Sequence, residues 1–114
     1  MNKREELILK YTNQLEEAGV KVDRELLTKV TVGLGPSIYR ADSSTVAASD
    51  EKELATVKNN YLIKKLGLED SPELDAAIDR AIETLGRSNR NKYRATLYYL
   101  LCKEFGKESV YDKN

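Results

Sequence analysis

Apolar residues recur at intervals of three and four positions along most of this chain of 114 residues. That spacing predicts amphipathic helices, because residues three and four apart share one face of a helix. The pattern predicts five helices, and a glycine stands close to the end of each. We therefore expect an all-α fold. The expected helices cover about residues 3–18, 24–34, 50–66, 72–85 and 89–105.

Residues that can cap a helix N-terminus precede each of the last four expected helices. They are Asp23, Asp50, Ser71 and either Ser88 or Asn89. Glu53 lies three residues after Asp50, which is the spacing of a capping box. Pro72 follows Ser71, and proline is favoured at the first position of a helix. These signals fix where the helices are expected to begin.

One long interval, about residues 35–49, lacks the helical pattern and is expected to form an irregular loop after the second helix. Five amphipathic helices must pack around a shared core to bury their apolar faces. Residues 1–114 are therefore predicted to form a single-domain bundle, with a frayed tail from about 107 to 114. Tyr98 and Tyr99 cannot both lie on one face of a helix, so we expect one in the core and the other half exposed.

Composition narrows the class of protein. The formal net charge is zero, and the apolar runs are far shorter than a membrane-spanning helix requires. The N-terminal residues carry charge with no apolar segment after them, so no secretory signal is expected. The single cysteine excludes an intrachain disulfide and is typical of a reducing compartment. We expect a cytoplasmic protein that does not contact membranes.

The chain has no histidine. This removes the commonest general base, the usual partner of a nucleophilic serine or cysteine, and the usual transition-metal ligand. Cys102 follows two leucines and is expected to be buried and unreactive. The acidic residues lack the spacing of a calcium-binding loop. We predict no catalytic residue, no metal site and no cofactor, and the chain is not expected to be an enzyme.

Charge is unevenly distributed along the chain. Residues 50–85 are rich in acids, whereas residues 87–107 are rich in bases. The basic residues begin with a dense run at the expected start of the fifth helix, a position that favours anions. With Arg40, this run supplies the candidate contacts for an anion or a partner: Arg87, Arg90, Lys92, Tyr93 and Arg94. Alternatively, its arginines pair with acids of the preceding helix, such as Asp79 and Glu83.

The interval from Gly33 to Ser37 has two glycines and a proline, which superficially suggests a phosphate-binding loop. It lacks the Gly-Lys-Ser/Thr ending of such loops. The glycines are better explained by a helix exit, with Ile38 and Tyr39 attaching the loop to the core. A small ligand held by Ser37 and Tyr39, together with Arg40, remains the alternative.

These observations support three hypotheses of function. The first is a non-enzymatic helical module for self-association or protein interaction, in which the acidic region of one copy meets the basic region of another. The second is binding of nucleic acid or of a phosphate-bearing ligand by Arg87–Arg94, with nucleic acid less favoured. The third is an enzyme that works without histidine, which would need a carboxylate, Tyr39 or a lysine as its acid or base.

Six segments of the chain also form a recognisable series. They are LTKVT at 27–31, GPSIY at 35–39, VAAS at 46–49, LATVKNN at 54–60, LIKKLGL at 62–68 and SNRNKYR at 88–94. In this order they resemble a family of small bacterial proteins, domain of unknown function 2853, over about Glu5 to Val110. The resemblance implies a short, soluble, single-domain bacterial protein. It implies no activity and no catalytic or binding residues.

Overall fold

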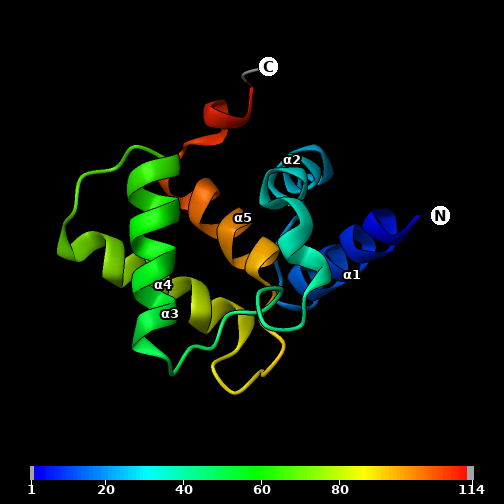
Figure 1. Cartoon of the computed structure of the whole chain (residues 1–114), viewed down its shortest axis with the longest axis horizontal. Helices are drawn as coiled ribbons and strands as arrows, with labels where there is room; N and C mark the ends of the chain where they lie inside the picture. The colour runs from blue at the N-terminus through cyan, green and yellow to red at the C-terminus, as the bar shows by residue number, and fades with distance from the viewer. Residues whose placement is uncertain (1, 113–114) are drawn as a thin grey trace.

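The structure is a computed structural model and describes residues 2–112. Over this range it is all-helical (Figure 1), so the predicted fold class is confirmed. The elements are α1 (Lys3–Glu17), α2 (Arg24–Leu34), the 3-10 helix η1 (Gly35–Tyr39), α3 (Glu51–Thr56), the π-helix η2 (Val57–Lys65), α4 (Pro72–Leu85), α5 (Arg94–Phe105) and the 3-10 helix η3 (Glu108–Tyr111).

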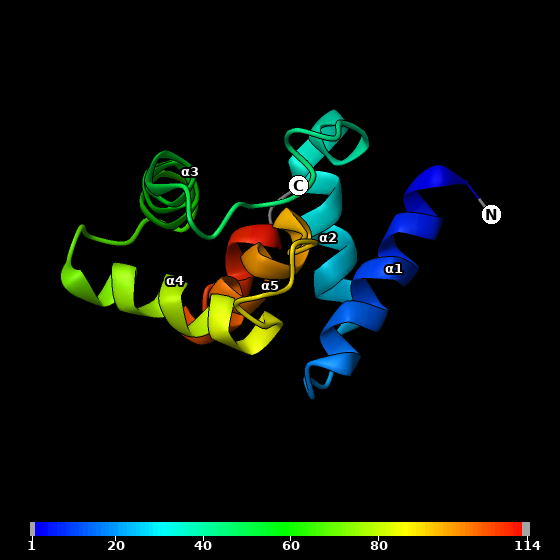
Figure 2. The same ribbon diagram turned by 90° about the horizontal axis from the view of Figure 1, so that it is seen from below.

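Helix α5, the last α-helix in the chain, lies in the middle of the molecule. Figure 2 shows α1 and α2 on one side of it and α3 and α4 on the other. Its apolar side chains belong to the same hydrophobic core as those of the other helices. Tyr98 and Tyr99 are both buried, so the prediction that one of them would be half exposed is wrong. Because other helices pack around α5 on several sides, neighbouring positions on it both contact protein.

Three of the four predicted helix starts are confirmed, that at Asp50 among them, and one is wrong. The Asp23 carboxylate accepts a hydrogen bond from the Leu26 N–H (3.2 Å) and caps α2. Ser71 precedes α4 as expected, although its side chain makes no capping bond. Helix α5 begins at Arg94, and neither Ser88 nor Asn89 caps it. The basic run therefore lies mostly in the loop before α5.

Helix α3 continues without a break into the π-helix η2, in which N–H groups bond to carbonyls five residues back. The Leu66 N–H, for example, donates to the Tyr61 carbonyl at 2.9 Å. This wider turn favours burial of residues four and five positions apart, and Val57, Tyr61, Leu62 and Leu66 are all buried. The expected third helix is therefore present, but more than half of its length is not α-helical.

The connection between α2 and α3 is more ordered than the irregular loop predicted over about 35–49. Its first five residues form η1, where Ile38 is buried as expected but Tyr39 is 52% exposed. Further along, Thr45 pairs with Tyr93 in an isolated antiparallel bridge. The connection is therefore attached to the segment that precedes α5.

The C-terminal segment is packed as far as it is described, so the predicted fraying is wrong for η3. The Tyr111 and Tyr61 hydroxyls are hydrogen-bonded at 2.9 Å, and the Tyr61 hydroxyl also donates to the Tyr98 carbonyl at 3.1 Å. The Tyr111 ring lies close to Gly33, where a Cβ would come within 3.4 Å of it. Residues 113–114 of the predicted tail lie outside the described range.

Arg94, the first residue of α5, connects three parts of the fold. Its Nε donates to the Ser43 carbonyl at 2.8 Å, and its guanidinium also bonds to the Tyr98 hydroxyl. The same guanidinium forms an ion pair with the Glu53 carboxylate of α3. The capping box predicted for Asp50 and Glu53 is therefore wrong: Asp50 caps α3 through the Lys52 N–H, and Glu53 binds Arg94 instead.

Glu53→Gln is expected to lower the free energy of unfolding by about 2–3 kcal/mol, because it leaves a buried guanidinium without its counter-charge. Urea denaturation followed by circular dichroism measures this difference. Glu51→Gln is the matched control, since Glu51 is exposed on the same helix, and it should change the free energy by less than about 1 kcal/mol. Equal losses in the two variants would contradict the assigned role of the ion pair.

Tyr11 gives the fold a dependence on alkaline pH. Burial, and next the nearby Tyr93 and Tyr39, raise the pKa of Tyr11 from 10.0 to about 12. The folded chain therefore keeps the phenolic proton to a higher pH than the unfolded chain does. The resulting contribution to stability is present below pH 10 and is lost as the pH rises toward 12.

Between about pH 9 and about pH 11.5, the free energy of unfolding should fall by about 2 kcal/mol less in the Tyr11→Phe variant than in the unmodified chain. Urea unfolding at several pH values across this interval provides the comparison. Tyr39→Phe removes only the smallest of the three causes that raise the pKa of Tyr11, so this variant should lose nearly as much stability over the interval as the unmodified chain. A Tyr11→Phe variant with the same pH profile as the unmodified chain would refute the assignment.

Candidate functional site

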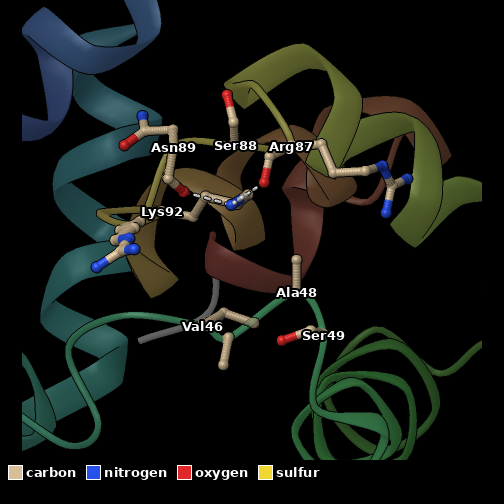
Figure 3. Close-up of a pocket in the computed structure, with 9 residues that line it drawn as sticks. Val46, Ala48, Ser49, Arg87, Ser88, Asn89 and Lys92 are labelled. Atoms are coloured by element: carbon tan, nitrogen blue, oxygen red, sulfur yellow. Dashed lines mark hydrogen bonds between the residues drawn. The ribbon is translucent and has the colours of Figure 1, made fainter.

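A pocket of about 410 Å³ lies between two loop segments that are far apart in the sequence. We call it the loop pocket. One wall comes from the connection before α3, and the other comes from the loop between α4 and α5 (Figure 3). Its lining residues are Val46, Ala47, Ala48 and Ser49 on the first wall and Arg87, Ser88, Asn89, Arg90 and Lys92 on the second.

Main-chain pairing places the two walls opposite each other. The Val46 N–H donates to the Lys92 carbonyl at 2.8 Å, and the Arg94 N–H donates to the Ser44 carbonyl at 2.9 Å. These two bonds flank the bridge between Thr45 and Tyr93. The pocket is therefore built on a fixed backbone junction next to the buried Arg94 ion pair.

Lys92 is the buried cation of the loop pocket, with 3% of its surface exposed. Its ammonium donates to the Arg87 carbonyl at 3.0 Å and to the Asn89 carbonyl (Figure 3). Burial, and next the charge of Arg87, lower the pKa of Lys92. An ammonium has three N–H donors. The two carbonyls use two of them, and no bond within residues 2–112 uses the third.

Arg87 lines the loop pocket, but its guanidinium extends toward α4 (Figure 3). There it bonds to the Asp79 carboxylate at 2.5 Å and to the Glu83 carboxylate at 2.6 Å. These are the two acids that the sequence suggested as alternative partners of the basic run, so internal pairing is confirmed for this arginine. Within the pocket Arg87 contributes its carbonyl and the base of its side chain.

Arg90 is the exposed cation of the loop pocket. Among residues 2–112 it takes part in no ion pair and no side-chain hydrogen bond, and no carboxylate lines the pocket beside it. Facing the cationic wall are the small apolar side chains of Val46, Ala47 and Ala48. The pocket thus combines positive charge on one wall with apolar surface on the other.

The structure brings together only part of the predicted candidate set. Arg87, Arg90 and Lys92 share the loop pocket, whereas Arg94 is buried with Glu53. The Ser37 hydroxyl donates to the Leu34 carbonyl. Arg40 and Tyr39 are exposed and do not line this pocket.

Tyr93, the remaining candidate, lines a second hollow of about 260 Å³ beside α1. Its ring packs against Tyr11 with 5.1 Å between the ring centroids. We call this space the tyrosine hollow. Its lining residues are Lys10, Asn13, Gln14 and Glu17 from α1 and Asn89, Asn91 and Tyr93 from the loop before α5.

Sequence reasoning missed the whole first wall of the loop pocket. The sequence places residues 46–49 in the expected irregular loop, because they have no charge and no helical pattern. Their position follows from the bridge between Thr45 and Tyr93, which joins distant parts of the chain. The available signal was the run of small residues, Ala47-Ala48-Ser49, which allows a ligand close approach to the backbone.

Residues 2–112 contain neither a cluster of metal-binding side chains nor a helix that could span a membrane. No group of three or more cysteine or acidic side chains in residues 2–112 is arranged to bind a metal ion. In the same range, no helix combines the length and the apolar character needed to cross a bilayer. Cys102 is buried as expected, and burial raises the pKa of its thiol to about 11.

Comparison with known proteins identifies the family of the chain. A search of proteins with curated descriptions found no match. A family model described as "Protein of unknown function (DUF2853)" matches residues 10–109, which include all the lining residues of the loop pocket and of the tyrosine hollow. The chain therefore belongs to this family, and the resemblance inferred from its sequence is confirmed.

Proposed function

We propose that this protein binds a small molecule with an anionic group in the loop pocket, and that it acts by binding rather than by catalysis. The observation that carries the proposal is the lining of the pocket. It includes three cationic residues and no carboxylate. Arg87 is already neutralised by Asp79 and Glu83, so Lys92 and Arg90 supply the positive charge that a ligand would meet.

The size of the pocket supports a small ligand. A volume of about 410 Å³ falls within the range of small-molecule sites in proteins. A nucleic acid strand would instead need several exposed cations along its phosphates. Arg94 is buried and Arg87 is paired within the chain, so the basic run presents too few unpaired exposed cations for that role.

The two walls also indicate the kind of ligand. A phosphate or carboxylate group would lie against Arg90 and the remaining Lys92 N–H. The rest of the molecule would lie against the methyl groups of Val46, Ala47 and Ala48. Ser49 and Ser88 also line the pocket. A small phosphorylated or carboxylated compound fits this arrangement better than a bare inorganic ion.

Arg90→Glu is expected to weaken the binding of pyrophosphate, used as the simplest probe, by tenfold or more, because it replaces a charge-assisted donor with a repelling carboxylate. Isothermal titration at low ionic strength gives the affinity, and the rise in melting temperature with ligand concentration provides a second measurement. Arg40→Glu is the control, since it makes the same charge change at an exposed site outside the pocket.

The control should keep the affinity of the unmodified chain. If both variants lost the same affinity for pyrophosphate, the effect would come from the overall charge of the protein, and the assigned site would be contradicted. If neither phosphate, pyrophosphate nor small carboxylates bind the unmodified chain, the proposal fails.

We propose self-association as a second candidate function, supported by large apolar side chains that are exposed on α1, on α2 and at the end of η1. In the described range, the large exposed apolar residues are Leu9 on α1, Val32 on α2 and Tyr39 at the end of η1. Arg87 pairs with Asp79 and Glu83 of its own chain. Contact between copies would therefore use the apolar side chains of α1 and α2, not the acidic and basic regions.

Val32→Asp is expected to shift the protein from dimer to monomer, because it would place a charge inside the apolar contact. Size-exclusion chromatography with light scattering, at low and high salt, reports the mass. Thr84→Asp introduces the same charge at an exposed position of α4 and should leave the mass unchanged. A monomeric unmodified chain at every concentration tested would exclude self-association.

A further inference from the structure

The loop pocket and the tyrosine hollow are neighbours. Asn89 lines both of them, and the loop before α5 separates the two spaces. A ligand that reaches past this loop would contact both surfaces. The chemistry of the tyrosine hollow therefore bears on which anionic molecule the protein binds.

The hollow contains an aromatic ring that is held in place. The Tyr93 N–H donates a hydrogen bond to the Gln14 side-chain oxygen at 3.3 Å, and the Tyr93 ring packs on Tyr11. The Lys10 ammonium lies 6.0 Å from the centre of the Tyr93 ring. A flat heterocycle stacks well on a fixed aromatic ring, whatever the identity of the base.

The hollow also contains side-chain amides without partners. Gln14 bonds through both ends of its amide, to the Asn91 carbonyl at 2.5 Å and to the Thr96 hydroxyl at 2.6 Å. The side-chain amides of Asn13 and Asn91, by contrast, make no hydrogen bond to any residue in the range 2–112. An amide offers one acceptor and two donors together, which matches the edge of a nucleic acid base.

The charges that line the two spaces favour a different part of the ligand in each. The tyrosine hollow has one cation, Lys10, and one acid, Glu17, whereas the loop pocket has cations and no acid. An anionic group is therefore favoured in the loop pocket. A neutral, polar ring is favoured in the tyrosine hollow.

We propose that the ligand is a nucleoside phosphate, with its phosphate at Arg90 and Lys92 and its base against Tyr93, within reach of Asn13 and Asn91. This inference rests on the proposed anion-binding function and adds the identity of the ligand class. The inference gives α1, through Asn13, a part in recognising the base, in addition to the residues of the basic run.

Titration of the full chain with ribose 5-phosphate and with the four ribonucleoside 5′-monophosphates tests this proposal. At least one nucleotide should bind tenfold more tightly than ribose 5-phosphate. The Asn13→Ala/Asn91→Ala variant should bind that nucleotide at least about fivefold more weakly than the unmodified chain does, because the hydrogen bonds to the base are lost while stacking on Tyr93 remains. Its affinity for ribose 5-phosphate should be unchanged. Asn59→Ala, at an exposed position of η2, is the control and should keep the preference for the nucleotide.

The outcomes distinguish a failure of the nucleotide assignment from a failure of the anion-binding function. If ribose 5-phosphate and all the nucleotides bind equally well, the inference is overturned and the anion-binding function stands. If the double asparagine variant binds the nucleotide as tightly as the unmodified chain does, the base lies elsewhere and the inference is likewise overturned. If none of these compounds binds, both fail.

Discussion

The contacts of the Arg94 guanidinium hold together the parts of the structure on which the candidate site depends. This one side chain bonds to the Ser43 carbonyl of the connection, to Glu53 of α3 and to the Tyr98 hydroxyl of its own helix. A buried cation is costly unless its partners are all in place, so each of these segments constrains the others. The main-chain bonds beside Arg94 then align the two walls of the loop pocket. The loop pocket is thus a consequence of how one buried charge is satisfied.

Much of the helical framework could be predicted from the sequence, because periodic apolar positions and helix-ending glycines act locally. The same reasoning failed where burial does not follow a single face. Tyr98 and Tyr99 are both buried because α5 is surrounded by other helices, and this arrangement cannot be seen from α5 alone. The packing of η3 also depends on distant partners, since Tyr111 bonds to Tyr61 and lies against Gly33.

The candidate site could be predicted only in part, for the same reason. The dense run of basic residues predicts a site that includes Arg87, Arg90 and Lys92, and these residues do line one pocket. The sequence could not distinguish cations used within the fold from those that face a ligand. That distinction depends on Asp79, Glu83 and Glu53, which tertiary structure brings to Arg87 and Arg94. The opposite wall, residues 46–49, could not be predicted, because small uncharged residues do not indicate a binding site until their neighbours in the fold are known.

The central place of α5 has a consequence for how the chain is made. This helix comes after the other four in the sequence, yet it is the one around which they pack. A ribosome releases the N-terminal helices first, and until α5 emerges their apolar faces have no common partner. We therefore expect the emerging chain to remain without its core through most of synthesis and to fold in one late step. Any factor that shields exposed apolar surface would act on this protein during that interval.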